Sequence, residues 1–123
     1  MTVEELYKQI DGDYAGALGR MQTEQFVARL IVMFLEDSAC EDLIAAWAEG
    51  DEGAAFRAAH TTKGVCVNLA LSELADVSSQ ITEALRPGND DLRASTDVDA
   101  LVKQFEAQYR KTEQAIKAFA AEQ

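Results

Sequence analysis

The sequence predicts an all-α protein, an up-down-up-down four-helix bundle with short additional helices at its N-terminus. Three observations lead to this prediction. Apolar residues recur at spacings of three and four in several long segments, the period of an amphipathic helix. The 123 residues include one Pro and seven Gly, whereas the helix-favouring residues Ala, Leu, Glu and Gln are abundant. No alternation with a period of two, which would indicate strands, occurs anywhere.

The first 22 residues are expected to form a helical cap across one end of the bundle. Thr2 and Glu5 have the spacing of a capping box, which predicts a short helix as far as about Gln9. The segment 11–13, Asp-Gly-Asp, interrupts this helix, and a second short one is predicted from Tyr14 to about Met21. Residues 23–123 then form the bundle, and the whole chain is expected to be a single domain.

Two long helices are predicted next. Thr23 is a suitable N-cap for a helix over residues 23–49 with a bend near Ser38, and Gly50 ends it. Asp51 is the predicted N-cap of a helix that runs to about Leu69. The apolar stripe expected along this second helix consists of Phe56, Ala59, Cys66, Leu69 and Ala70.

The last two long helices follow a tight turn. Ser72 is the expected cap of a helix that ends before Pro87-Gly88. Residues 88–95 are expected to form a polar loop, the most mobile connection in the chain. Thr96 with Asp99 predicts the start of a final helix that reaches about Ala121.

Composition and charge argue against several classes of partner and site for this protein. The formal net charge of −11 makes nucleic acid and anionic membranes improbable partners, because both are bound through clustered Lys and Arg. No run of 18 apolar residues predicts a membrane span, and the acidic N-terminus argues against a secretory signal, so a cytoplasmic protein is expected. Cys40 and Cys66 form no metal-ligand motif with the single His, and both thiols are expected to be buried and reduced.

The only histidine, His60, is the main candidate in the sequence for a chemically reactive side chain. Its helical phase differs from that of Ala59 by about 100°, which places the imidazole on the outer face. The residues above and below it on that face are Arg57, Lys63, Gly64 and Val67. Gly inside a helix costs about 1 kcal/mol relative to Ala, so Gly64 indicates that space is needed one turn from His60. Lys63 is a flexible positive charge of a kind that suits a phosphoryl oxygen.

The segment Ala59-His60-Thr61-Thr62-Lys63-Gly64, followed by Asn68-Leu69, resembles the histidine-containing phosphotransfer (HPt) domain family. The resemblance covers residues 20–86 best. Thr62 stands where the family usually has Leu or Ile, and Ala70 where it usually has Gly. The resemblance implies a four-helix bundle, phosphorylation at Nε2 of His60, and receiver domains of response regulators as partners, with a hybrid sensor histidine kinase as a further possible partner. It also implies that the receiver supplies Mg²⁺, so that this chain needs no cofactor or metal of its own.

Several residues receive expected roles at this site. Lys63, Gly64 and Arg57 are expected to support the phosphoryl group, although Arg57 could instead pair with Glu52 or Asp51. The residues expected to dock a partner are Val67, Asn68 and Leu71. A neighbouring helix could equally cover Val67 and Leu71, and Asn68 could simply help to end its helix. Residues on the preceding helix that could flank the docking surface are Phe34, Glu36 and Asp37.

The expected function is that of a phosphocarrier and not of an enzyme. The sequence has no Gly-rich nucleotide-binding loop and no nucleophile arranged with the histidine in a triad. A neutral imidazole is a good nucleophile that can carry a phosphoryl group covalently. Two alternatives remain open at this stage: a helical adaptor that binds signalling partners without being phosphorylated, and a phosphoacceptor fragment of a larger sensor kinase. A monomer is expected.

Overall fold

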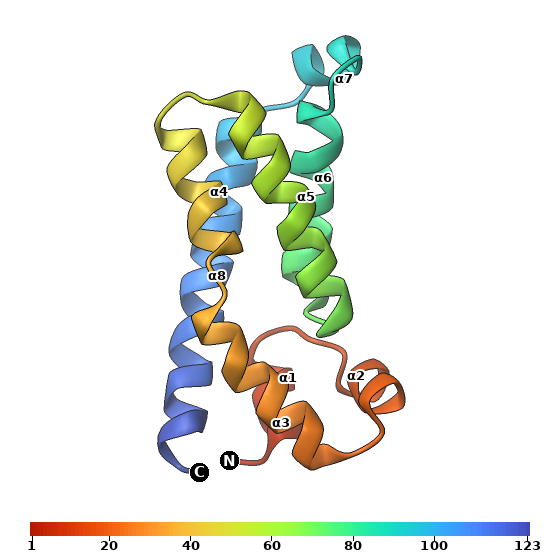
Figure 1. Cartoon of the computed structure of the whole chain (residues 1–123), viewed down its shortest axis with the longest axis vertical. Coiled ribbons are helices and arrows are strands. Elements are labelled where there is room, and N and C mark those ends of the chain that lie inside the picture. The colour runs from red at the N-terminus through yellow and green to blue at the C-terminus, as the bar shows by residue number, and fades with distance from the viewer.

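The computed structural model describes all residues from 1 to 123 and contains helices but no strands, which confirms the all-α prediction (Figure 1). The helices are α1 (Val3–Gln9), α2 (Tyr14–Met21), α3 (Glu24–Met33), α4 (Ala39–Ala48), α5 (Glu52–Asn68), α6 (Ser72–Leu85), α7 (Asp90–Ser95) and α8 (Val98–Ala121). A 3₁₀ turn, η1 (Phe34–Glu36), lies between α3 and α4.

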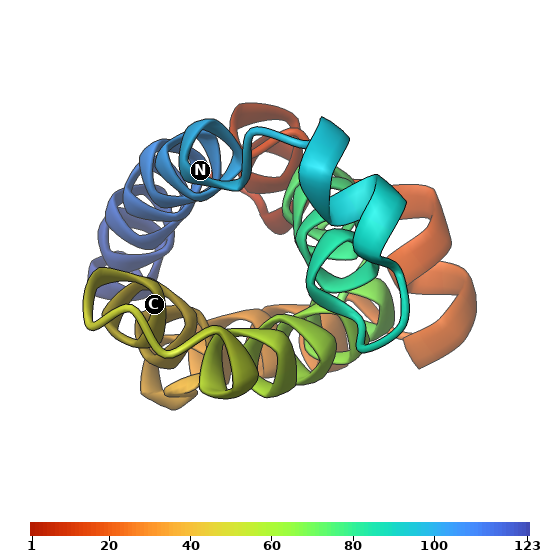
Figure 2. The same ribbon diagram turned by 90° about the horizontal axis from the view of Figure 1, so that it is seen from above.

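The long helices form the predicted up-down-up-down bundle. In Figure 1, α3 and α4 together run up the molecule, α5 returns, α6 runs up and α8 returns. Contacts join α4 to α5, α5 to α6, α6 to α8 and α8 to α4, so these helices surround a common axis (Figure 2). Helix α5 therefore has a bundle neighbour on each side, which leaves its outer face free.

The two N-terminal helices share the core of the bundle. Helix α1 packs against α8, and α2 packs against α3. One cluster of 27 buried hydrophobic residues extends from α1 to α8 and includes Leu6 and Tyr7. The Tyr7 hydroxyl donates a buried hydrogen bond of 2.8 Å to the carbonyl oxygen of Leu69, the C-cap of α5. The N-terminal segment is thus fixed to the end of the helix that carries His60.

The prediction of a single helix over residues 23–49 is wrong. Helix α3 tightens into η1 after Met33, and Asp37 then adopts an extended conformation with φ −80° and ψ 127°. The Asp37 carboxylate accepts a 2.8 Å hydrogen bond from the backbone N–H of Ala39, which satisfies a donor in the first turn of α4. A bend near Ser38 was expected, whereas the structure has a complete break between two helices.

Two predicted helix starts and one predicted loop also need correction. The residue before α6 is Leu71, which offers no side-chain cap, and Ser72 is already helical. Asp97, and not Thr96, caps α8 by accepting a 3.0 Å hydrogen bond from Ala100. Within the predicted loop 88–95, residues 90–95 form α7, and Arg93 pairs at 2.9 Å with Glu52 at the start of α5.

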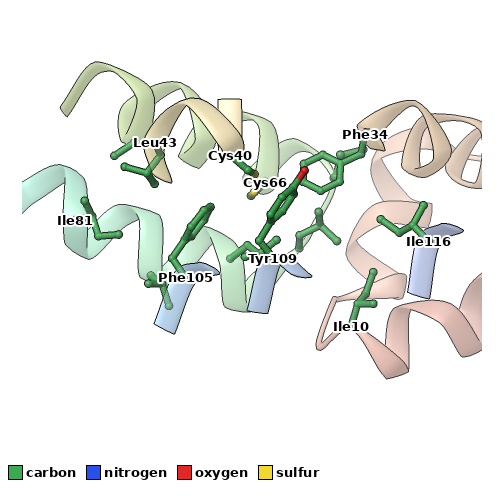
Figure 3. Close-up of a cluster of buried hydrophobic side chains, with 14 of the residues drawn as sticks. Ile10, Phe34, Cys40, Leu43, Cys66, Ile81, Phe105, Tyr109 and Ile116 are labelled. Carbon is green, nitrogen blue, oxygen red and sulfur yellow. The ribbon is translucent and has the colours of Figure 1, made fainter. Parts of the chain in front are cut away.

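The two cysteines lie side by side in the core. Cys40 of α4 and Cys66 of α5 are both buried and free, as expected from the sequence. Figure 3 shows their sulfur atoms next to each other, near Phe34 and Tyr109. The hydrogen bond with Cys66, together with burial, raises the pKa of the Cys40 thiol. The pair therefore behaves as part of the apolar contact between α4 and α5.

Candidate functional site

Helix α5 is held closely between its neighbours by small side chains. Gly50, with φ +76°, ends the preceding helix, and the Asp51 carboxylate accepts a 3.0 Å hydrogen bond from the N–H of Ala54 to begin α5. The buried residues of α5 are Ala55, Ala59, Thr62 and Cys66. Because none of these is large, α4 and α6 can pack close to the α5 backbone. Phe56, expected on this stripe, is only half-buried.

His60 lies exposed on the outer face of α5, which confirms the exposure predicted from its helical phase. The Phe56 ring, one turn before it, stacks against the imidazole with 6.3 Å between ring centroids and 23° between ring planes. The guanidinium carbon of Arg86 in turn lies 5.4 Å from the centroid of the Phe56 ring. Phe56 therefore supports the imidazole from one side, and Arg86 supports Phe56.

Helix α6 contributes an ion pair next to the stacked side chains of His60 and Phe56. Arg86 and Glu83 are joined at 2.8 Å. The hydrogen bond from the Arg86 guanidinium lowers the pKa of the Glu83 carboxyl, and the positive charge of Lys63 lowers it further. Through Arg86, this ion pair contacts the Phe56 ring that stacks on His60. We did not predict Glu83, Arg86 or the support from Phe56, because periodicity within one helix does not show which residues of the next helix face it.

Lys63 and Gly64 provide a cation and open space one turn after His60. Lys63 is half-buried and forms no ion pair. A Cβ atom built at Gly64 would have no other atom within 4 Å beyond its own helix backbone and adjoining residues. Since the space beside Gly64 is unfilled, its lack of a side chain does not serve packing between helices. The surface is open to an approaching group on this side of His60.

Arg57 does not lie where the sequence suggested. Its Nη1 atom is 3.5 Å from the Cβ position of Gly53, one turn nearer the N-terminus and farther from His60. Arg57 instead lines a cleft between α4 and α5 with Asp37 and Asp42. The alternative pairing with Glu52 or Asp51 does not occur either, since Glu52 pairs with Arg93.

Comparison with protein-family models matches residues 29–118 to the Hpt domain. The chain belongs to the Hpt domain family. Hpt domains are phosphotransfer modules of two-component signalling that interact with receiver domains of response regulators, and they are carriers of the phosphoryl group and not catalytic domains. The matched range contains the whole His60 cluster, whereas α1 and α2 lie outside it.

The chain gives no significant match to a curated protein or to a solved structure. None of its helices combines the length and the apolar character needed to cross a membrane. No group of three or more His, Cys, Asp and Glu side chains is arranged to hold a metal ion.

The residues proposed to dock a partner are only partly brought together in this Hpt domain. Val67 is 43% exposed and Asn68 is exposed, both near the end of α5. Leu71 is only 1% exposed and belongs to the core, so its expected place on a docking surface is wrong. Phe34, 4% exposed, is likewise a core residue. Glu36 is exposed and Asp37 half-buried where η1 meets α4.

The two departures from the usual Hpt pattern have visible structural effects. Thr62 is fully buried and its hydroxyl has no hydrogen-bond partner, so a polar group occupies a site suited to an apolar side chain. Ala70 adopts φ +56°, in the left-handed region that Gly tolerates better. Its carbonyl oxygen accepts a 2.8 Å hydrogen bond from the N–H of Asp13, which helps to hold the turn between α5 and α6.

Proposed function

We propose that this Hpt domain accepts a phosphoryl group on Nε2 of His60 from the aspartyl phosphate of one receiver domain and passes it to the aspartate of another. The observation that carries the proposal is the exposed imidazole beside the open space at Gly64, within the part of the chain that matches the Hpt domain. A receiver must bring its aspartate within reach of the ring, and this side of α5 leaves room for it.

The chemistry follows from the neutral imidazole. With the proton on Nδ1, the lone pair of Nε2 attacks phosphorus, an N–P bond forms, and the O–P bond of the acyl phosphate breaks. The aspartate leaves as a carboxylate with the bonding electron pair, and transfer to the next receiver reverses these steps. Lys63, which forms no ion pair, can approach the phosphoryl oxygens and offset their charge as the group moves. Phe56 restricts the orientation of the ring by stacking on it.

In this scheme the Hpt domain brings the nucleophile and a docking surface, while the receiver brings the aspartate and Mg²⁺. The cation would bind among carboxylates of the receiver and would neutralise charge during transfer. The chain therefore acts as a carrier that is phosphorylated and dephosphorylated by its partners.

The test uses the whole chain and a panel of receiver domains from the same genome. The receiver domains are first phosphorylated with labelled acetyl phosphate and then mixed with the chain. The native chain should acquire label that is lost in acid and stable in alkali, as expected of phosphohistidine. His60→Gln should acquire none. Since an exposed residue contributes within about ±0.5 kcal/mol to stability, its melting temperature should remain close to that of the native chain.

Two other results would contradict the proposal. Label that persists in His60→Gln would place the acceptor on another residue. A native chain that binds receivers but takes no label from any of them would instead support the adaptor function. Whether the chain acts alone or within a larger sensor kinase does not alter these outcomes.

A further inference from the structure

Only some of the Lys and Arg side chains of this acidic chain form ion pairs with its carboxylates. Six of its eleven Lys and Arg side chains lie in ion pairs: Arg86, Arg93, Lys103, Arg110, Lys111 and Lys117. The remaining five are Lys8, Arg20, Arg29, Arg57 and Lys63. Two of these five belong to α5, and a third, Arg20 of α2, is hydrogen-bonded to it. Three of the five cations that form no ion pair thus lie on the helix that carries His60 or are bonded to it.

Arg20 is held at the end of α5 by one hydrogen bond. Its Nη1 atom donates to the carbonyl oxygen of Val67 at 2.5 Å. This carbonyl lies at the negative end of the α5 dipole, where a cation is favoured. A guanidinium group has five N–H donors, so the exposed Arg20 keeps most of them available to a partner. The bond also limits the freedom of a long side chain that would otherwise lose entropy on docking.

The position of this arginine relative to His60 suits a partner that covers both. Val67 follows His60 by seven residues, which places it on the same helical face about 10 Å farther along. Val67 is one of five large hydrophobic residues that the chain exposes. A small cleft where α2 meets α5 and α6 is lined by Gly16, Arg20 and Val67, among other residues. An apolar contact and a held cation therefore lie together below the imidazole.

We propose that α2 forms part of the receiver-docking surface and that Arg20 is a positioning residue, whose guanidinium pairs with a carboxylate of the docked receiver beside Val67. The inference rests on the proposed function and goes beyond the family match, which begins at residue 29 and omits α2. Because the chain carries a net charge of −11, an acidic receiver is repelled by most of its surface. Local cations at Arg20 and Lys63 reduce that repulsion where the two proteins meet, which favours one orientation of the complex.

The experiment compares Arg20→Gln with Arg29→Gln. Both changes remove one unpaired, exposed arginine, but Arg29 lies on α3 beside Met33 and Phe119. Each variant is phosphorylated in two ways: by the phosphorylated receiver that labels the native chain fastest, and by phosphoramidate, a small donor that needs no docking surface. We expect Arg20→Gln to raise KM for the receiver about fivefold, with kcat little changed and a weaker dependence on salt. Arg29→Gln should match the native chain, and both variants should react normally with phosphoramidate.

Two further variants separate docking from support of the α5 terminus. Arg20→Lys keeps the charge and should restore most of the affinity. Val67→Glu keeps the backbone carbonyl that Arg20 binds, but it places a carboxylate beside the guanidinium and should raise KM as well. Helix content and melting temperature are measured for every variant, and kinetics are compared well below the lowest melting temperature.

Each remaining outcome counts against the inference. Equal KM values for Arg20→Gln and Arg29→Gln would overturn it, since the position of the charge would then not matter. Slower reaction of Arg20→Gln with both donors would show that Arg20 acts on the conformation of α5 and not on docking. If the native chain reacts with phosphoramidate but with no receiver, the proposed exchange and this inference both fail. If the native chain exchanges phosphoryl groups with a receiver and Arg20→Gln has no effect on the kinetics, this inference fails but the proposed exchange stands.

Discussion

Gly64 is the residue of the candidate site whose surroundings allow the sharpest mutational test. A Cβ atom at this position would meet nothing within 4 Å, so a side chain can be added without disturbing the core. We expect Gly64→Gln to fold at least as stably as the native chain, because Gly inside a helix costs about 1 kcal/mol relative to good helix formers. The added side chain would project beside His60 and obstruct the receiver. Since a misplacement of about 1 Å can cost 10²-fold in rate, transfer should be much slower.

The measurements are thermal melting and single-turnover transfer from a phosphorylated receiver. Gly64→Ala is the matched control: it should gain about 1 kcal/mol in stability, with a smaller effect on transfer because a methyl group adds little bulk. If Gly64→Gln unfolded the domain while its folded fraction transferred at the normal rate, the glycine would serve packing instead.

The sequence predicted the positions of some candidate site residues on the surface but not those of others. His60, Lys63 and Gly64 follow from spacing along one helix, and the structure places them together on its outer face. Arg57 shares that helix, but its long side chain reaches toward Gly53, a choice of rotamer that spacing does not determine. Arg86 and Glu83 depend on how α6 packs against α5, which is a tertiary property. Arg20 requires both the packing of α2 and a backbone carbonyl as its partner.

At the scale of elements, the turn between α5 and α6 contains a residue in an unfavourable conformation. Ala70 has φ +56°, which costs a residue with a Cβ atom roughly 1 kcal/mol relative to Gly. We therefore expect Ala70→Gly to stabilise the domain by about 1 kcal/mol and to raise its melting temperature by about 4 °C. The measurement is thermal or urea unfolding followed by circular dichroism.

Gly50 offers the matched control for this prediction. It has φ +76°, and a Cβ atom there would meet nothing within 4 Å, so Gly50→Ala changes little except the backbone preference. This variant should lose about as much stability as Ala70→Gly gains. A loss of stability in Ala70→Gly would show that contacts of the Ala70 methyl group outweigh its backbone strain.

The break between α3 and α4 shows why element boundaries were harder to predict than element types. Before the break the core positions are Val27, Ile31 and Phe34, and after it they include Cys40 and Leu43. A continuous helix would place its next core positions near 38 and 41, so the pattern shifts by one or two residues. A broad apolar stripe conceals such a shift. At the break, the Asp37 carboxylate accepts a hydrogen bond from the first backbone N–H of α4, a local contact that the apolar pattern does not show.

For the whole molecule, several buried groups predict loss of stability at alkaline pH. Burial raises the pKa of Tyr7 and raises the pKa of Tyr109 to about 12, and the hydrogen bond with Cys66 raises the pKa of the Cys40 thiol. In the unfolded chain these groups lose protons at about pH 8.5 for Cys and about pH 10 for Tyr. Between the unfolded and folded pKa values, the unfolded state binds fewer protons, so the free energy of unfolding decreases as pH rises.

Unfolding should therefore show a plateau near neutral pH and a decline above about pH 8.5, steeper above about pH 10. The measurement is the free energy of urea unfolding between pH 7 and 11. Tyr109→Phe keeps the ring and removes the phenol, so its decline above pH 10 should be shallower than that of the native chain. An unchanged slope in this variant would mean that the Tyr109 phenol ionises freely in the folded protein.

The exposure of His60 would also limit the lifetime of a phosphoryl group bound to it. A phosphoryl group held on that ring would face bulk water, and the neighbouring side chains, Phe56 and Lys63, would cover only part of it. Spontaneous hydrolysis would then compete with delivery to the next protein at every moment after loading. The fraction of signal that survives would depend on how often a suitable partner arrives during the lifetime of the phosphohistidine. If the proposed exchange takes place, the openness that would admit a receiver would also make the carrier sensitive to the cellular concentration of its recipient, and a scarce recipient would let the stored signal decay.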